Sequence, residues 1–127
     1  INLTTSAMVK EVDFCGVKSG KDIDKFAKCG FTPVPAQKVS APIIEECPVS
    51  LECRVTESKL LGSHTMFLAE IVGIDVNEKF IDSKGKLNLQ QCGLAAYAHG
   101  EYFALGRKLG DFGYSVRKKK KKKPAKK

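Results

Sequence analysis

The chain has 127 residues, 43% of them hydrophobic, a length that suits one domain with a single modest core. Its net charge of +8 is concentrated at one end, because residues 117–127 hold nine of the 22 basic residues and none of the 14 acidic ones. The remaining 13 basic and 14 acidic side chains leave residues 1–116 nearly neutral, which makes a nucleic-acid-binding fold unlikely. No apolar run is long enough to span a membrane, so we expect no membrane partner.

Five cysteines form an odd set without a C-x-x-C motif: Cys15, Cys29, Cys47, Cys53 and Cys92. A structural zinc site needs four ligands at close spacing, and the cysteines and two histidines do not have that spacing. We therefore predict no metal site, reduced thiols and a cytoplasmic location.

The first part of the chain predicts an extended run followed by a short helix. Residues 1–5 favour a strand, and Ser6 is the predicted cap of a helix that ends near Cys15 and Gly16. A polar loop with a glycine at each end, residues 16–20, follows this helix.

A second helix is predicted over residues 23–29, with Asp22 as its N-cap and Gly30 after its last residue. The loop and helix from Lys18 to Phe26 have two interpretations. They form either a solvated connection, the more common case, or a loop whose backbone N–H groups bind an anion or cofactor. The next run, residues 31–35, must be extended because each proline disfavours helix at the residue before it.

Two long strands are predicted at the centre of the chain. Residues 49–56 alternate, with Val49, Leu51, Cys53 and Val55 facing inward and the polar residues between them facing water. Residues 66–76 are apolar at nearly every position, which predicts a strand covered on both faces. Gly62 supplies the reversal between them. The chain is therefore expected to be rich in β-structure.

The last third of the chain predicts short elements. Residues 77–86 favour a loop with one short turn, residues 87–93 a helical turn ended by glycine, and residues 94–98 a strand. His99 follows this strand. A lone histidine is more often structural than catalytic, yet this one lies at a strand end beside Gly100, where sites tend to form.

Residues 117–127 are predicted to be a disordered basic tail. Such a segment is more often a solubilising tail than a contact for nucleic acid or an anionic membrane. Its binding to polyanions would be weak and strongly dependent on salt.

Several stretches resemble the flavin reductase-like family of the FMN-binding split barrel, in particular its flavoredoxin-type proteins. The similar stretches are residues 1–5, 13–26, 61–72, 97–103 and 109–116. This resemblance implies a mainly β (α+β) fold, an antiparallel split β-barrel of the FMN-binding type with a few short helices. It also implies that residues 1–116 form the C-terminal part of such a domain.

Family members carry an N-terminal region of several strands before the segment that resembles residues 1–5. That region usually holds a Ser/Thr-rich stretch and a proline pair that help to seat FMN. It is absent from this chain, so the resemblance covers roughly the C-terminal two-thirds of a family domain, and the N-terminal part of the barrel is expected to be missing.

The resemblance also implies a function and a set of site residues. FMN is the implied cofactor, NADH or NADPH or a redox protein the implied electron partner, and a homodimer the implied assembly. Asn2 would lie by the flavin ring, and His99 would act at the ring edge as the catalytic residue. The loop and helix that close over the flavin would contribute Lys18, Ser19, Lys25 and Phe26.

One alternative belongs to a different class. A truncated, non-enzymatic binding module could contact polyanions through the lysine-rich tail. It predicts a colourless protein with salt-sensitive affinity, whereas the flavoprotein hypothesis predicts a yellow one.

Overall fold

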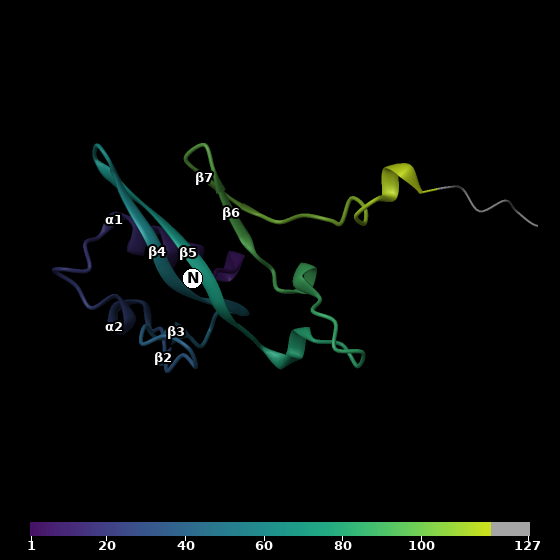
Figure 1. Cartoon of the computed structure of the whole chain (residues 1–127), viewed down its shortest axis with the longest axis horizontal. Coiled ribbons are helices and arrows are strands. Elements are labelled where there is room, and N and C mark those ends of the chain that lie inside the picture. The colour runs from purple at the N-terminus through teal and green to yellow at the C-terminus, as the bar shows by residue number, and fades with distance from the viewer. Residues whose placement is uncertain (118–127) are drawn as a thin grey trace, which may run out of the picture.

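The computed structural model describes residues 1–117, so the predicted basic tail lies, apart from Arg117, outside the described residues. The main sheet is antiparallel, with β1 (Asn2–Leu3), β4 (Val49–Leu61) and β5 (His64–Val76) in the order β1-β4-β5. Figure 1 shows β4 and β5 as a long twisted ribbon. Two smaller antiparallel pairs accompany it in the described part of the chain. They are β2 (Pro33–Val34) with β3 (Ile43–Ile44), and β6 (Ala95–Ala98) with β7 (Glu101–Ala104).

The β4–β5 ribbon confirms the predicted central strand pair and its reversal. Leu61 pairs with His64, and Gly62 takes a φ of +64° in the two-residue turn between them. Glycine suits this left-handed conformation because it has no Cβ. The His64 Nδ1 atom lies 2.8 Å from the Ser63 hydroxyl.

Two β-bulges interrupt the ribbon. The first is on β5, where Val72 has no opposite partner, and the second is on β4, where Thr56 has none. A bulge adds one residue to one strand, increases the local twist and shifts the alternation of side chains. A strict period of two therefore does not continue along either strand.

The prediction that the polar side chains of β4 face water is wrong at the first two of them. Ser50 and Glu52 are each only 2% exposed, whereas Val55, predicted to be inside, is 57% exposed. Segment 37–39 covers the Glu52 side of the strand, and Asn2 of β1 covers Ser50. Both covering segments are distant in sequence, so the alternation of β4 alone could not reveal them.

The prediction that β5 is covered on both faces is not met within residues 1–117. Phe67 is 61% exposed, and Met66, Leu68, Ile71 and Ile74 are exposed as well. The apolar core of the described residues is small and lies near the start of β4; its buried side chains are Met8, Cys47, Val49 and Cys92.

The first helix forms close to its predicted position. A 3-10 turn over Ser6–Met8 leads into α1 (Val9–Val17), so α1 ends one residue beyond the predicted glycine. Its last turn is closed by Lys18 in an extended conformation, whose N–H donates to the Phe14 carbonyl. The Ser6 side chain does not cap the helix; its hydroxyl donates to the Leu94 carbonyl at 3.5 Å.

The second helix is shorter than predicted. The cap of α2 (Lys25–Cys29) is Asp24 and not Asp22, since the Asp24 carboxylate accepts from the Ala27 N–H at 3.1 Å. Gly30 ends the helix with a φ of +68°, as predicted.

The short elements after β5 follow the predictions more closely. Two 3-10 turns, Glu78–Phe80 and Leu89–Gln91, occupy the expected segments, and β6 confirms the expected strand. Strand β7 was not predicted. The β6–β7 hairpin is tied to the start of the chain, because the Ala95 N–H donates to the Thr4 carbonyl at 3.1 Å.

The fold is mainly β with a few short helices, and within residues 1–117 the sheets do not close into a barrel. Figure 1 shows α1, α2, β2 and β3 on one side of the ribbon and the segment after β7 extending away from it. Across residues 1–117, none of the helices has the length and apolar character needed to cross a membrane.

Candidate functional site

The end of α1 and the β6–β7 hairpin enclose a cavity with a volume of about 420 Å³. The lining residues are Val12, Asp13, Gly16 and Val17 from α1, and Tyr97, Gly100 and Tyr102 from the hairpin. Its walls therefore combine aliphatic and aromatic groups with one carboxylate.

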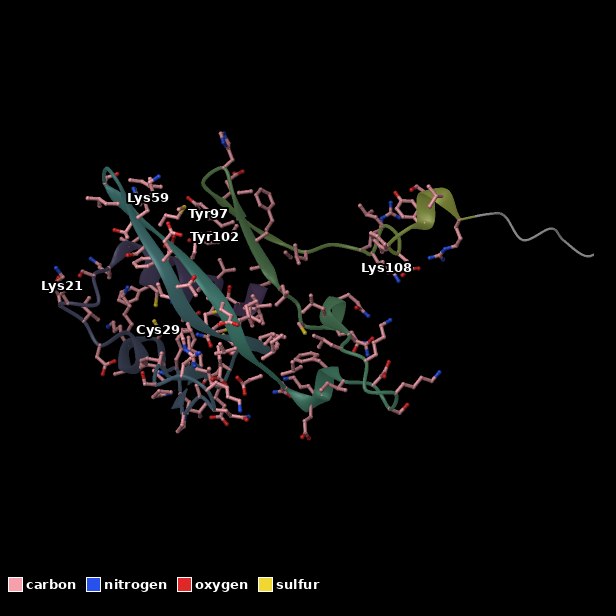
Figure 2. The ribbon with its side chains drawn as sticks, viewed as in Figure 1. Lys21, Cys29, Lys59, Tyr97, Tyr102 and Lys108 are labelled. Atoms are coloured by element: carbon pink, nitrogen blue, oxygen red, sulfur yellow. The ribbon has the colours of Figure 1, made fainter. Side chains whose placement is uncertain are left out.

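Tyr102 fixes the hairpin against the helix. Its hydroxyl donates to the Asp13 carboxylate at 3.1 Å, and its ring lies 5.0 Å from that of Tyr97 at an interplanar angle of 58°. Figure 2 shows both tyrosines next to the central ribbon. Burial raises the pKa of Tyr102, and the hydrogen bond to Asp13 raises it further because it holds the phenol proton. Tyr102 is thus a neutral donor at physiological pH.

His99 lies at the turn of this hairpin. It has a φ of +52° and precedes Gly100 at +83°, so both central residues of the two-residue turn are left-handed. Its side chain is exposed, and the neighbouring Gly100 lines the cavity. His99 itself is not among the residues that line the cavity.

Lys18 and Ser19 directly follow the lining residue Val17 in the chain, but neither of them lines this cavity. Both side chains are exposed, and the Ser19 hydroxyl accepts from the Lys21 N–H at 3.2 Å. Three of the predicted site residues, Lys18, Ser19 and His99, therefore lie within two positions in the sequence of residues that line this cavity, but they are not part of its lining.

Lys25 and Phe26 line a second, smaller cavity. This cavity measures about 210 Å³ and is lined also by Cys15, Phe31 and Ile44. The Lys25 ammonium donates to the Cys15 carbonyl at 2.5 Å. Residues Cys15 and Gly16 of α1 line different cavities, so the end of α1 lies between the two.

Asn2 lines neither cavity, but it contacts Ile44, which lines the smaller one. Its side-chain oxygen accepts from the Ile44 N–H at 3.0 Å and from the Ser50 hydroxyl at 2.8 Å. Asn2 therefore joins β1 to β3 and β4 and sets the position of Ile44. Of the six predicted residues, only Lys25 and Phe26 line one of these two cavities.

A buried carboxylate that the sequence did not single out lies under the β4–β5 ribbon. The Glu52 carboxylate accepts backbone N–H bonds from Gln37 at 2.9 Å, Lys38 at 2.5 Å and Val39 at 3.1 Å. Burial acts to raise the pKa of Glu52, but these hydrogen bonds outweigh it and the pKa is lowered.

The pKa of Asp75, which lies opposite Ser50 on β5, shifts in the opposite direction. Burial raises its pKa, and the nearby Glu52 carboxyl raises it further by hydrogen bonding and by charge. Among the described residues, Asp75 Oδ2 is buried without a hydrogen-bond partner. The sequence holds one indication of the Glu52 and Asp75 pair. Segment 37–39 is irregular, so its backbone N–H groups need a hydrogen-bond acceptor from elsewhere in the chain.

The comparisons with known proteins agree with this fold. Residues 1–106 match the family described as flavin reductase like domain. The chain therefore belongs to the flavin reductase-like family.

Two flavoredoxin structures are similar to the chain, each at 30% identity. The flavoredoxin of Desulfovibrio vulgaris (Miyazaki F) has a TM-score of 0.82, with 92% of this chain and 63% of that one covered. For the flavoredoxin of Methanosarcina acetivorans, the TM-score is 0.75, with 91% and 63% covered. The observed fold is thus that of the flavoredoxin split barrel, with less than two-thirds of its length.

Curated relatives show the same partial coverage. An uncharacterized protein of Archaeoglobus fulgidus is 35% identical over 88 residues, which are 69% of this chain and 50% of that protein. An uncharacterized protein of Pyrococcus abyssi is 30% identical over 109 residues, or 86% and 62%. The chain spans about half to three-fifths of these relatives.

Proposed function

We propose that this chain forms the C-terminal part, residues 1–116, of an FMN-binding oxidoreductase or electron carrier of the flavoredoxin type. The observation that carries the proposal is the 420 Å³ cavity between α1 and the β6–β7 hairpin, in a chain of the flavin reductase-like family. Lys18 and Ser19 follow its lining residue Val17 in the sequence, and His99 precedes its lining residue Gly100. Ligand pockets commonly have volumes of about 300–1,000 Å³, so its size suits at least part of a flavin.

The chemistry of the residues present also fits FMN. The tyrosine and valine side chains of the cavity suit a planar aromatic ring, and the lysines after α1 suit a phosphate. Lys18 and Ser19 would bind the anionic part of the cofactor, and Lys25 and Phe26 would hold the loop in place from the smaller cavity. Asn2 would act from β1 near the ring.

FMN, when bound, supplies the hydride or electron transfer, and the protein supplies binding, orientation and electrostatics. An ammonium group beside the site, that of Lys18 or Lys25, stabilises negative charge that develops there. His99 would orient the electron donor at the rim. Tyr102, held neutral by Asp13, keeps the hairpin wall in place.

NADH, NADPH or a redox protein would donate the electrons, and a homodimer would be the working form. The five free cysteines support a cytoplasmic location. These assignments rest on the family and on the arrangement of the cavity.

An absorption spectrum of the purified chain, titrated with FMN, tests the proposal. We expect a bound-flavin spectrum that bleaches under anaerobic NADH, NADPH or a reduced redox protein. A chain that ends at Arg117 serves as the control, and we expect it to bind FMN equally. Absence of flavin binding, with salt-sensitive polyanion binding that the shortened chain loses, would instead favour the polyanion-binding module.

Replacing His99 tests its role separately. Asparagine tolerates a positive φ better than most residues, so His99→Asn keeps the turn and removes the imidazole. We expect hydride transfer to slow by roughly tenfold or more while the Kd for FMN changes less than about threefold. Unchanged turnover with weaker FMN binding would exclude His99 from the chemistry.

A further inference from the structure

The thiols of Cys15 and Cys29 lie next to each other. Cys15 is near the end of α1, Cys29 is the last residue of α2, and their Sγ atoms are 3.7 Å apart. A disulfide has an S–S length of about 2.04 Å, so the sulfurs need to approach by only about 1.7 Å. Both residues are half-buried, which leaves them open to small reagents. Figure 2 shows Cys29 on the side of the molecule that carries the helices.

The other three cysteines differ from this pair. Cys47 and Cys92 are buried, and the Cys53 thiol donates to the Leu51 carbonyl at 3.6 Å. Of the five cysteines, only Cys15 and Cys29 lie within hydrogen-bonding distance of each other. The chain therefore has one pair of thiols positioned to form a disulfide, and its other three cysteines serve as internal controls.

The pair encloses residues 15–29, which include the loop between α1 and α2 and the whole of α2. Within this loop, Ser19 accepts from the N–H groups of Lys21 at 3.2 Å and Asp22 at 3.4 Å. The Lys25 ammonium already joins α2 to the Cys15 carbonyl. A covalent bond between the thiols would thus close a segment whose ends the fold holds together.

We propose that Cys15 and Cys29 are a redox-active pair that forms an intramolecular disulfide with a low-molecular-weight disulfide as oxidant. One thiolate attacks the oxidant and forms a mixed disulfide, and one reagent thiol leaves. The second protein thiolate then displaces the other reagent thiol. The two protein thiols are oxidised, one reagent disulfide is reduced to two thiols, and each protein thiol gives up its proton.

The surroundings of Cys29 favour the protonated form of its thiol. Burial raises the pKa of Cys29, and its hydrogen bond with Cys15 and the charges of Cys15 and Glu11 act in the same direction, whereas the Lys25 ammonium opposes them. Since the thiolate is the reacting form, oxidation should accelerate as the pH rises above neutral.

The test uses the full chain equilibrated with mixtures of oxidised and reduced glutathione, alkylated and digested with trypsin. Cleavage after the lysines and arginines separates the pair, because Cys15 falls in 11–18 and Cys29 in 29–38, while Cys53 falls in 39–54. We expect 11–18 and 29–38 to be recovered as one linked product in oxidising mixtures, while Cys53 stays alkylated. Reducing mixtures should restore both free thiols.

Two variants complete the experiment. Cys15→Ser should abolish the linked product and leave Cys29 with a mixed glutathione disulfide, and Cys53→Ser should change neither. The oxidised wild-type chain should also melt roughly 5 °C higher than the reduced one, a difference that Cys15→Ser removes. Equal alkylation of Cys15, Cys29 and Cys53 in oxidising mixtures would overturn the proposal, and so would links between chains or mixed disulfides alone.

Discussion

The two ends of the β4–β5 ribbon differ in what surrounds them. At the Val49 end, β1 and segment 37–39 pack against the strands, and Val49 is 4% exposed. At the Gly62 end β4 and β5 pair with each other, and Leu60 is 73% exposed among the described residues. Both ends have regular strand pairing, so the strands of this protein form whether or not their side chains are buried. Within residues 1–117, the apolar core is found only at the Val49 end.

Removing the Glu52 carboxylate should produce the largest difference in stability between the two ends. Glu52→Ala leaves three covered N–H groups of segment 37–39 without an acceptor, and we expect the melting temperature to fall by roughly 10 °C or more. Glu57→Ala, an exposed site on the same strand, is the matched control and should change it by no more than about 2 °C. Equal losses would show that the buried end is not held by these bonds.

Truncating apolar side chains at the two ends gives the next largest difference. Val49→Ala removes two buried carbons and should cost about 2 kcal/mol, because transfer and cavity terms add. Leu60→Ala should cost less than about 0.5 kcal/mol, since that side chain is already in water. Chemical denaturation measures both, and a Leu60→Ala loss as large as that of Val49→Ala would mean that the Gly62 end is covered in solution.

A smaller effect of opposite sign is expected at Asp75. Its raised pKa means that the folded state binds the proton more tightly than the unfolded state does. This contribution is fully present below about pH 4 and is lost as the pH rises through the folded value. Asp75→Asn stays neutral, so it should melt a few degrees higher than the wild type at pH 7.

The pH profile provides the control for Asp75. The gain should shrink toward pH 4, where the wild-type carboxyl becomes protonated as well. Glu70→Gln, at an exposed position on the same strand, should show no such trend. A gain for Asp75→Asn that is independent of pH would show that carboxylate repulsion is not its cause.

Local sequence patterns predicted where helices and strands form better than they predicted which of their side chains are buried. The Gly62 reversal, the Gly30 helix end and the strand after Gly93 follow from backbone preferences that act over a few residues. The burial of Ser50 and Glu52 depends on segments up to 48 residues away, and no short pattern contains that information.

The candidate site shows the same limit. Of the residues that the resemblance selected, only Lys25 and Phe26 line a cavity at the end of α1, and the roles of all six remain predictions. The sequence did not indicate that Lys25 is bonded to the Cys15 carbonyl, or that Tyr102 bonds to Asp13 across 89 positions. Those contacts arise where helix and hairpin meet, which requires the three-dimensional arrangement.

The bulges at Val72 and Thr56 have a geometric consequence for the Gly62 end. Beyond Thr56, Leu60 and Phe67 point to one side of the ribbon, while Leu61, Met66 and Leu68 point to the other, and all five are exposed. Packing against one face of the ribbon would leave the apolar side chains of the other face exposed to water. Burial of all five side chains requires contacts on both faces.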